Sequence, residues 1–299
     1  MNSPSSNSKN RIRNRFLNDS PDSSSASYPN SSAGRYQSPY RRIAVFGGVY
    51  NNHFALEALL EDSSRQGTEA IFCLGDLGGF GPHPDKVFPL LQAGDVQVVQ
   101  GNYDHSIGNS LDDCRCGYTD PSDNYYAKLS YDYTFAHTSD RWKSWMKHLP
   151  SELRVDLGRF HLLLCHGSPR KTNEFLWEST SSTHFLEKLC REHQADAILA
   201  THTGIHWSRR LPENRHFVNV GSIGRPANDG NLHVWYTMIT ADDDRLNVEF
   251  LPLPYPYKAL AKEMRTEDLP EAFVETIETG WWTTCMEVLP GKERRRGKW

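Results

Sequence analysis

Residues 70–82 read AIFCLGDLGGFGP, a short apolar run that is followed by a carboxylate and a loop with four glycines. The run 70–74 has the length and composition of a buried strand, and the glycines and proline after it are typical of a turn. A helix is predicted from about Pro84 to Leu91, where apolar residues return. The segment therefore predicts a strand, a glycine-rich loop and a helix in succession.

The segment before it has the same order of elements. The apolar run Ile43–Phe46 ends in two glycines, and apolar residues then recur at helical spacing over residues 53–60. A third strand is predicted over residues 96–99. Alternating strands and helices predict an α/β fold with a mainly parallel sheet, in which ligands bind at the carboxyl ends of the strands.

The middle and the second half of the chain supply further helices and strands. Residues 112–149, which are rich in Tyr, Trp and charge, are predicted to form two helices that cap the sheet. The next predicted elements are a strand pair, a helix and a strand, at 153–155 with 160–165 (joined at Gly158), 182–193 and 197–200. The last predicted strands form a second, antiparallel set at 217–220, 233–239 and 246–251.

Changes in composition divide the chain into three parts. Residues 1–41 are dominated by Ser, Asn, Pro and charged residues, and they are predicted to be disordered because they cannot bury enough apolar surface to offset the entropy of ordering. Residues 42–255 form the predicted domain. Residues 256–299 are predicted to form a C-terminal helical extension with a basic tail, in which Trp281 and Trp282 pack on the domain.

Length and charge limit the classes of function. A chain of 299 residues with 37% apolar residues is long enough for one large core. The net charge of -4 and the pI near 6.3 do not indicate nucleic acid as the main partner. No stretch approaches the about 20 apolar residues of a membrane span, and the N-terminus lacks the apolar segment of a secretory signal. We therefore expect a cytoplasmic protein without a membrane partner; the sequence does not indicate its oligomeric state.

Six cysteines are present. Cys73 and Cys165 lie in apolar runs, and reduced thiols in a core explain them best. Cys114 and Cys116 form a C-x-C in a polar loop, which could hold a metal or react. Without a second pair at zinc-site spacing, ordinary loop cysteines are the favoured interpretation.

Polar side chains follow four of the apolar runs. Asp76, Asn102, His166 and His202 each come directly or almost directly after a predicted strand. A single Asp or His at a strand end is usually a turn former. Together, a carboxylate, an amide oxygen and two imidazoles are a suitable ligand shell for a divalent transition metal.

These motifs resemble those of the calcineurin-like metallophosphoesterases, in particular of their small bacterial phosphodiesterase branch. The matching stretches, in the family's order, are GDLGGFGP at 75–82, GNYD at 101–104, HGSP at 166–169 and NVGSIG at 219–224. The resemblance runs from about Ile43 to Leu253. It implies a two-sheet metallophosphoesterase sandwich flanked by helices, which is classed as α/β or, by some schemes, as α+β.

The resemblance implies one metal site that is complete. Asp76 would be the carboxylate that bridges two metals in the family, and the other three residues of the set would complete the shell of the second metal: Asn102, His166 and His202. The private ligands of the first metal are all replaced, since Gly48, Tyr50 and Gly204 stand at their positions. We therefore expect one divalent ion, Mn, Fe or Zn, with a second site in doubt.

A rebuilt first site is the alternative. His53, His206 and Tyr50 lie close in sequence to the lost ligand positions. His53 is expected at the start of a helix, where a solvent-facing side chain is the more common arrangement.

Four further residues are candidates for catalysis and substrate binding. Tyr103 stands where the family has a catalytic His and could protonate a leaving oxygen, although its phenol is a weaker acid than imidazolium. Asp104 either orients Tyr103 or caps the turn. Arg170 and Arg225 are candidates for binding phosphate, because guanidinium matches its geometry, with a structural ion pair as the alternative.

Two functions from different classes are compatible with these residues. The first is metal-dependent hydrolysis of a small phosphodiester or phosphomonoester. The second is a non-catalytic protein of the same fold that binds a nucleotide or a protein partner in the cleft. The loop 114–123 and the pair Tyr125 and Tyr126 are candidates for a lid over the substrate, with ordinary packing as the alternative for the aromatic side chains.

Overall fold

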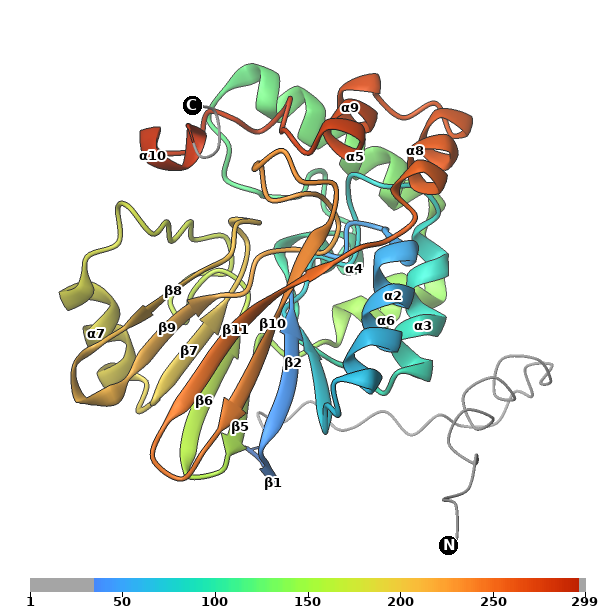
Figure 1. Ribbon diagram of the computed structural model, residues 1–299. Coiled ribbons are helices and arrows are strands. Elements are labelled where there is room, and N and C mark those ends of the chain that lie inside the picture. The colour runs from blue at the N-terminus through green and yellow to red at the C-terminus, as the bar shows by residue number, and fades with distance from the viewer. Residues whose placement is uncertain (1–34, 296–299) are drawn as a thin grey trace, which may run out of the picture. The chain divides into compact units, whose positions relative to one another are not determined.

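The computed structural model describes residues 35–295, which fold around two β-sheets (Figure 1). The six-stranded sheet has the order β1 (Arg35–Tyr40), β5 (Glu152–Leu157), β6 (Phe160–Cys165), β7 (Ala197–Ala200), β9 (His216–Asn219) and β8 (Trp207–Arg210). The five-stranded sheet has the order β11 (Leu246–Leu253), β10 (Val234–Ala241), β2 (Arg42–Phe46), β3 (Ala70–Cys73) and β4 (Gln97–Val98). The predicted two-sheet sandwich is therefore confirmed.

The two faces of β2 show how the sequence builds the layers. Ile43 and Val45 pack into the core between the sheets, whereas Ala44 and Phe46 pack into the core beneath the helices. Successive side chains of a strand point to opposite faces, so a strand that is covered on both sides is apolar throughout. This explains why the first strands of the chain are uninterrupted apolar runs.

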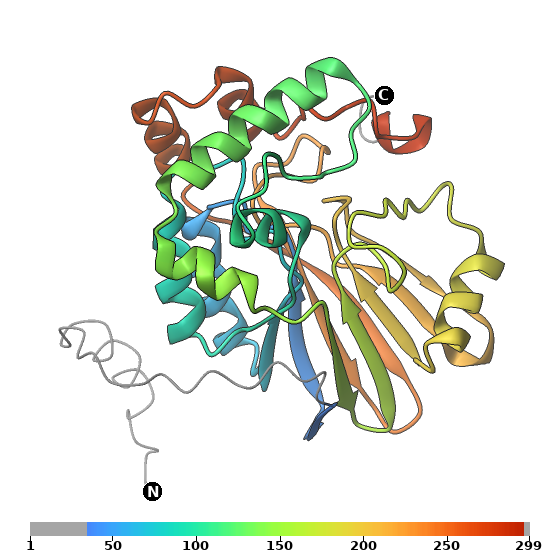
Figure 2. The same ribbon diagram turned by 180° about the vertical axis from the view of Figure 1, so that it is seen from behind.

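Helices cover the outer face of each sheet (Figures 1 and 2). Those over the five-stranded sheet include α2 (His53–Arg65), α3 (Val87–Ala93, after the short helix η1 at Pro84–Lys86), α4 (Asn102–Gly108), α5 (Pro121–His137) and α6 (Asp140–Lys147). The six-stranded sheet is covered by α7 (Thr183–Glu192), whose Leu186 and Leu189 pack with Leu163 and Ile198. The helices predicted from periodicity are present.

The C-terminal extension lies along the carboxyl ends of the strands, where both views show the red segment (Figures 1 and 2). It contains α8 (Tyr257–Thr266), α9 (Glu271–Thr279) and α10 (Gly291–Arg294). The buried carboxylate of Asp123 in α5 accepts hydrogen bonds from the backbone N–H groups of Cys285 (2.6 Å) and Glu287 (3.1 Å). The extension is thus fixed over the edge of the sheets at which the predicted ligands were expected.

Two expectations need correction. Arg35–Tyr40, inside the segment predicted to be disordered, forms β1 and pairs in parallel with β5; residues 1–34 lie outside the described residues. An edge strand pairs through its backbone, so its side chains need not form an apolar pattern.

The predicted second, antiparallel set of three strands is wrong. The strand at 216–219 belongs to the six-stranded sheet, where it is parallel to β7 and antiparallel to β8, whereas β10 and β11 join β2 in the five-stranded sheet. The sequence did not reveal β8 (Trp207–Arg210, sequence WSRR) because only its first residue is buried. The short helix η2 (Pro212–Asn214) joins β8 to β9. Within residues 35–295, no helix combines the length and hydropathy that a bilayer span requires.

Candidate metal centre

Loops at the carboxyl ends of the strands bring three of the four predicted ligands together. One ligand atom each from Asp76, His166 and His202 lies within 4.8 Å of the other two, and all three side chains are buried. These loops follow β3, β6 and β7. The convergence expected from the positions of these residues after strands is therefore present.

His166 is held in the orientation of a metal ligand. Its Nδ1 lies 2.6 Å from the carbonyl oxygen of Leu74, so Nδ1–H donates to that carbonyl. Its Nε2 lies 3.3 Å from the Asp76 carboxylate and 3.2 Å from Nδ1 of His202. A backbone acceptor on one ring nitrogen is the usual way in which a protein directs the lone pair of the other toward a metal.

Asn102 provides the test of whether this site suits a cation. Its Nδ2 donates to the carbonyl of Cys114 at 2.9 Å, which fixes the direction of the amide, while its Oδ1 is buried without a hydrogen-bond partner. Its two neighbours in sequence flank the carboxylate of Asp76, and Tyr103 N–H donates to it at 3.1 Å. A buried acceptor without a donor is costly, and a coordinated cation would satisfy it. The residues present thus fit a divalent ion.

Asp76 and His202 are in protonation states that suit a metal, whereas for His166 the Asp76 carboxylate outweighs burial and raises the pKa above its usual value. Burial alone raises the pKa of the Asp76 carboxyl, but the adjacent imidazole of His166 outweighs burial and lowers it below its usual value. Burial, reinforced by His166, lowers the pKa of His202 to about 3, so its imidazole is neutral. An ionised carboxylate and a neutral imidazole are the forms that bind divalent ions.

The backbone around Asp76 is unusual. Asp76 and His202 have positive φ values of 58° and 65°, a region that residues other than glycine rarely adopt and that is found at functional sites. A Cβ atom on Gly75 would lie 2.3 Å from the backbone N of Gly101, and one on Gly101 would lie 2.4 Å from the backbone N of Asp76. The two motif glycines therefore allow the ligand loops after β3 and β4 to touch.

Asp104 holds these loops together. Its buried carboxylate accepts backbone N–H groups of Asp76 (2.9 Å), Leu77 (3.0 Å) and Gly101 (2.8 Å). Burial raises its pKa to about 6, and the charge of Asp76 adds to the rise. Of the two roles considered from the sequence, these contacts correspond to capping the turn, and they position Asp76 itself.

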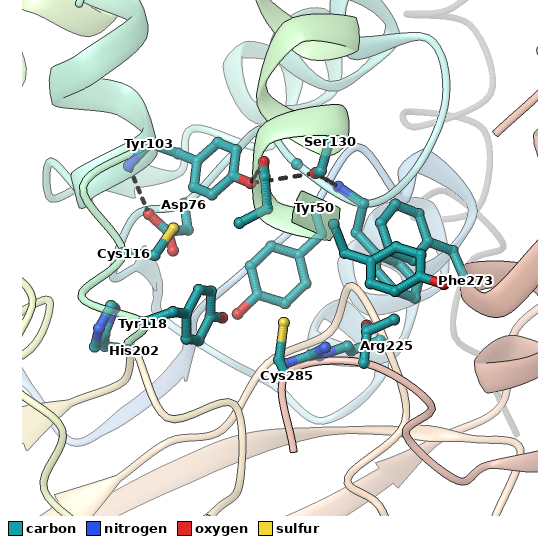
Figure 3. A pocket seen from close by; sticks show the side chains of 15 residues that line it. Tyr50, Asp76, Tyr103, Cys116, Tyr118, Ser130, His202, Arg225, Phe273 and Cys285 are labelled. Carbon is teal, nitrogen blue, oxygen red and sulfur yellow. Dashed lines mark hydrogen bonds between the residues drawn. The ribbon is translucent and has the colours of Figure 1, made fainter. Parts of the chain in front are cut away.

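Tyr103 lines the pocket, and its hydroxyl points toward α5. The hydroxyl lies 3.2 Å from Ser130 Oγ, which in turn accepts the N–H of Phe80 at 2.6 Å (Figure 3). Burial raises the pKa of the phenol, so it remains protonated. It is a hydrogen-bond donor at the wall of the site.

The positions that lack first-metal ligands face a cluster of aromatic side chains. A Cβ atom on Gly48 would lie 2.6 Å from Cζ of Tyr50 and 2.8 Å from its hydroxyl oxygen. A Cβ atom on Gly204 would lie 3.3 Å from Cη2 of Trp282. The space that a side chain at position 48 would use is thus filled by the Tyr50 ring. Burial raises the pKa of that phenol, which keeps it protonated.

His53 and His206 do not rebuild the first site. His53 is buried, contrary to the solvent-facing position expected, with Nε2 3.7 Å from Glu263 Oε2. The expectation was wrong because α8 of the C-terminal extension covers this end of α2. His206 packs between the rings of Trp235 and Phe250, at 4.6 and 4.7 Å between ring centroids. Within residues 35–295, the set of His, Cys, Asp and Glu placed to hold a metal consists of Asp76, His166 and His202.

A cavity of about 50 Å³ adjoins the ligands (Figure 3). Its walls are largely aromatic and come from four distant parts of the chain: Tyr50, Phe80, Tyr103, Tyr118, Tyr126 and Phe273. Asp76, His202 and Arg225 also line it. Arg170 does not belong to the lining residues; its side chain is about half exposed and forms an ion pair with Glu174. The structure therefore brings Arg225, and not Arg170, to the ligands.

Sequence reasoning left open the roles of several lining residues. Cys114 and Cys116 form a disulfide, and Cys116 lines the cavity. Tyr118 and Tyr126, from the segment considered as a lid, also line it, whereas Tyr125 is exposed. Cys285 was missed, because no motif connects it to a site that is far away in sequence.

Comparisons with known proteins agree with this fold and site. Residues 42–244 match the model of the calcineurin-like phosphoesterase superfamily domain. The uncharacterized protein MJ0912 of Methanocaldococcus jannaschii is 23% identical over 254 residues, which cover 80% of this chain and 98% of that protein.

Two solved structures share the fold. The hypothetical protein PH1004 from Pyrococcus horikoshii has a TM-score of 0.66 and 22% identity, over 81% of this chain and 99% of that one. A metallophosphoesterase from Sphaerobacter thermophilus has a TM-score of 0.61 and 23% identity, over 80% and 99% of the two chains. Since the family model spans most of the described residues and the predicted motifs lie within it, the chain belongs to the calcineurin-like phosphoesterase superfamily.

Proposed function

We propose that this protein hydrolyses a small phosphate ester, a phosphomonoester or phosphodiester, with one divalent ion held by Asp76, Asn102, His166 and His202. The observation that carries the proposal is the convergence of Asp76, His166 and His202, whose ligand atoms lie within 4.8 Å of one another. The buried Oδ1 of Asn102, in the loop whose Tyr103 N–H donates to Asp76, has no hydrogen-bond partner and is the fourth candidate ligand. A residual fold without chemistry would not need to maintain such an acceptor. Mn, Fe and Zn all suit this mixed nitrogen and oxygen shell.

When bound, such an ion polarises a phosphoryl oxygen and lowers the pKa of a coordinated water. The chain's own residues supply orientation and charge. Arg225 binds phosphate oxygens, since its guanidinium lines the same cavity as Asp76 and His202. Arg170 is the weaker candidate for this role, because its exposed side chain is already paired with Glu174.

Tyr103 is the proposed proton donor. Its phenol is protonated and lies at the wall of the cavity, so that a small movement away from Ser130 directs the hydroxyl to a leaving oxygen. A phenol is a weak acid, which favours substrates with good leaving groups. Asp104 acts as a positioning residue, through the backbone of the loop that carries Asp76.

Hydrolysis of p-nitrophenyl phosphate and bis(p-nitrophenyl) phosphate tests the proposal, with protein stripped by a chelator and reloaded with Mn, Fe or Zn. We expect turnover only after reloading. The ratio of the two rates assigns the monoester or the diester as the substrate class. No turnover with any of the three metals would contradict the proposal.

The replacement of the first site favours a second candidate function, a non-catalytic protein that binds a nucleotide or a protein partner. The specific observation is that Tyr50 fills the space of the missing ligand at position 48. Metal uptake without turnover, together with binding of a nucleotide to the metal-loaded protein, would favour this alternative.

A further inference from the structure

The three positions that lack first-metal ligands, 48, 50 and 204, lie next to one group of side chains. Gly48 faces the ring of Tyr50, which itself stands at a lost ligand position, and Gly204 faces Trp282. Arg225 packs on both rings, with its Cζ 5.8 Å from the Tyr50 centroid and 3.6 Å from the Trp282 centroid. The rings at the lost ligand positions therefore contact a guanidinium.

Arg225 is a buried charge without a counter-ion. Its relative exposure is 7%, and within residues 35–295 no carboxylate forms an ion pair with it. Its Nε is buried and has no hydrogen-bond partner. An uncompensated buried charge is strongly unfavourable, so the site is built for an anion that is supplied from outside the chain.

Trp282 fixes the position of this guanidinium. Its Nε1–H donates to the carbonyl of Pro226 at 2.6 Å, and its backbone N–H donates to Asn228 Oδ1 at 3.0 Å. Both acceptors belong to the loop that carries Arg225. The indole face therefore lies over the guanidinium with little freedom to move, which is the geometry of a strong cation–π contact.

We propose that Arg225, positioned by Trp282 of the C-terminal extension, forms a phosphate subsite that replaces the first metal ion. This inference rests on the proposed function and extends it: one ion and one guanidinium share the phosphoryl group between them. Arg225, Asp76 and His202 line one cavity of about 50 Å³, which has room for a group of the size of phosphate. Guanidinium binds such oxyanions through two parallel N–H donors.

The C-terminal extension is anchored where Trp282 can position Arg225. Asp123 anchors Cys285 through its backbone N–H, three residues after Trp282. Cys285 and Thr284 line the cavity as well. The extension is thus a wall of the subsite.

Calorimetric titration of inorganic phosphate into the metal-loaded full chain tests the inference. The variants are Arg225→Met, Trp282→Leu and the double variant, with Trp281→Leu as the matched control, because Trp281 does not line the cavity. We expect Trp282→Leu to weaken phosphate binding by about tenfold, the size expected for a desolvated cation–π contact. Arg225→Met is expected to weaken it by at least as much, because it removes the guanidinium that donates to phosphate. The control is expected to bind phosphate like the unchanged protein.

The double variant separates positioning from structure. If Trp282 acts through Arg225, Trp282→Leu has no further effect on phosphate affinity in the Arg225→Met background. Equal losses in both backgrounds, an unchanged affinity of Trp282→Leu, or absence of phosphate binding by the unchanged protein would each overturn the inference. Trp282→Phe, which keeps an aromatic face, is expected to lose less than Trp282→Leu and replaces it if that variant does not fold. Phosphate binding is measured without turnover, so failure of the proposed hydrolysis alone would leave this result standing.

Discussion

The two halves of the site differ in what fills them. In the retained half (Asp76, Asn102, His166 and His202), ligand atoms of Asp76, His166 and His202 converge, and Asn102 Oδ1 and His202 Nε2 are buried without a hydrogen-bond partner. The replaced half, positions 48, 50 and 204, is packed with the rings of Tyr50 and Trp282. The retained half presents polar atoms to a ligand, whereas the replaced half is filled by side chains of the protein. Removal of side chains without other change would leave a void at these positions, so the rings there indicate that the region is repacked.

The largest expected effect comes from the retained half. His166→Ala removes a ligand and also leaves the carbonyl of Leu74 without its donor. We expect loss of bound metal and a fall in phosphoesterase activity of at least about a thousandfold, because the metal-dependent stabilisation of the reaction is lost. Elemental analysis and steady-state kinetics measure the two effects.

The matched control is Arg170→Ala, which lies after the same motif but is paired with Glu174 at the surface. We expect metal content unchanged and activity within about threefold of the original, as for most exposed ion pairs. A loss of activity in Arg170→Ala as large as that in His166→Ala would contradict the assignment of phosphate binding to Arg225 and not to Arg170.

The next largest expected effect is a loss of stability when a side chain is added in the replaced half. A methyl group at Gly48 would meet Tyr50 at 2.6 Å, and the backbone there has a φ of +49°. We expect Gly48→Ala to lower the free energy of unfolding by about 1–3 kcal/mol through overpacking and backbone strain. Chemical denaturation of the variant and of the unchanged protein measures this change in the free energy of unfolding.

The double variant Gly48→Ala/Tyr50→Ala shows whether Tyr50 is the cause. Removing the ring relieves the contacts of the new methyl group with Tyr50, while Ser222 Cβ stays 2.8 Å away. The two changes are therefore expected to be non-additive by about 1 kcal/mol. Strict additivity would mean that Tyr50 does not fill the position of the lost ligand.

The smallest expected effect concerns His53, the candidate for a rebuilt site. Burial, with help from Lys86, lowers its pKa to about 4, below the value near 6.5 of the unfolded chain. The neutral form is therefore favoured in the fold, and the contribution to stability is complete above about pH 6.5 and is lost as the pH falls toward 4. Between pH 7 and 5 we expect the protein to lose about 1–2 kcal/mol from this group.

Denaturation of His53→Asn at the two pH values measures this contribution, and the variant is expected to lose less stability on acidification. Its metal content is expected to stay the same, since His53 lies beside Glu263 and not in the cavity. A lower metal content in this variant would place His53 among the ligands.

The sequence could predict the retained half because each of its residues follows the end of a strand directly or within a few residues, and parallel strands bring their carboxyl ends to one edge. It could also show which ligands are missing. It could not show what fills their place, because Trp282 reaches position 204 from 78 residues away and through the packing of the whole extension. The role of Asp104 was left open for a similar reason, since its partners are backbone N–H groups that no sequence pattern marks. The strands β1 and β8 were not predicted, because edge strands pair through their backbone and need no apolar side-chain pattern.

The number of divalent ions bound per chain decides whether this protein holds a single metal site. Elemental analysis of the full chain, after loading with Mn, Fe or Zn and removal of free metal, is expected to give one ion per chain, and none in His166→Ala. Two ions per chain would contradict the account, because they would require a first site that Tyr50 and Trp282 leave no room to form.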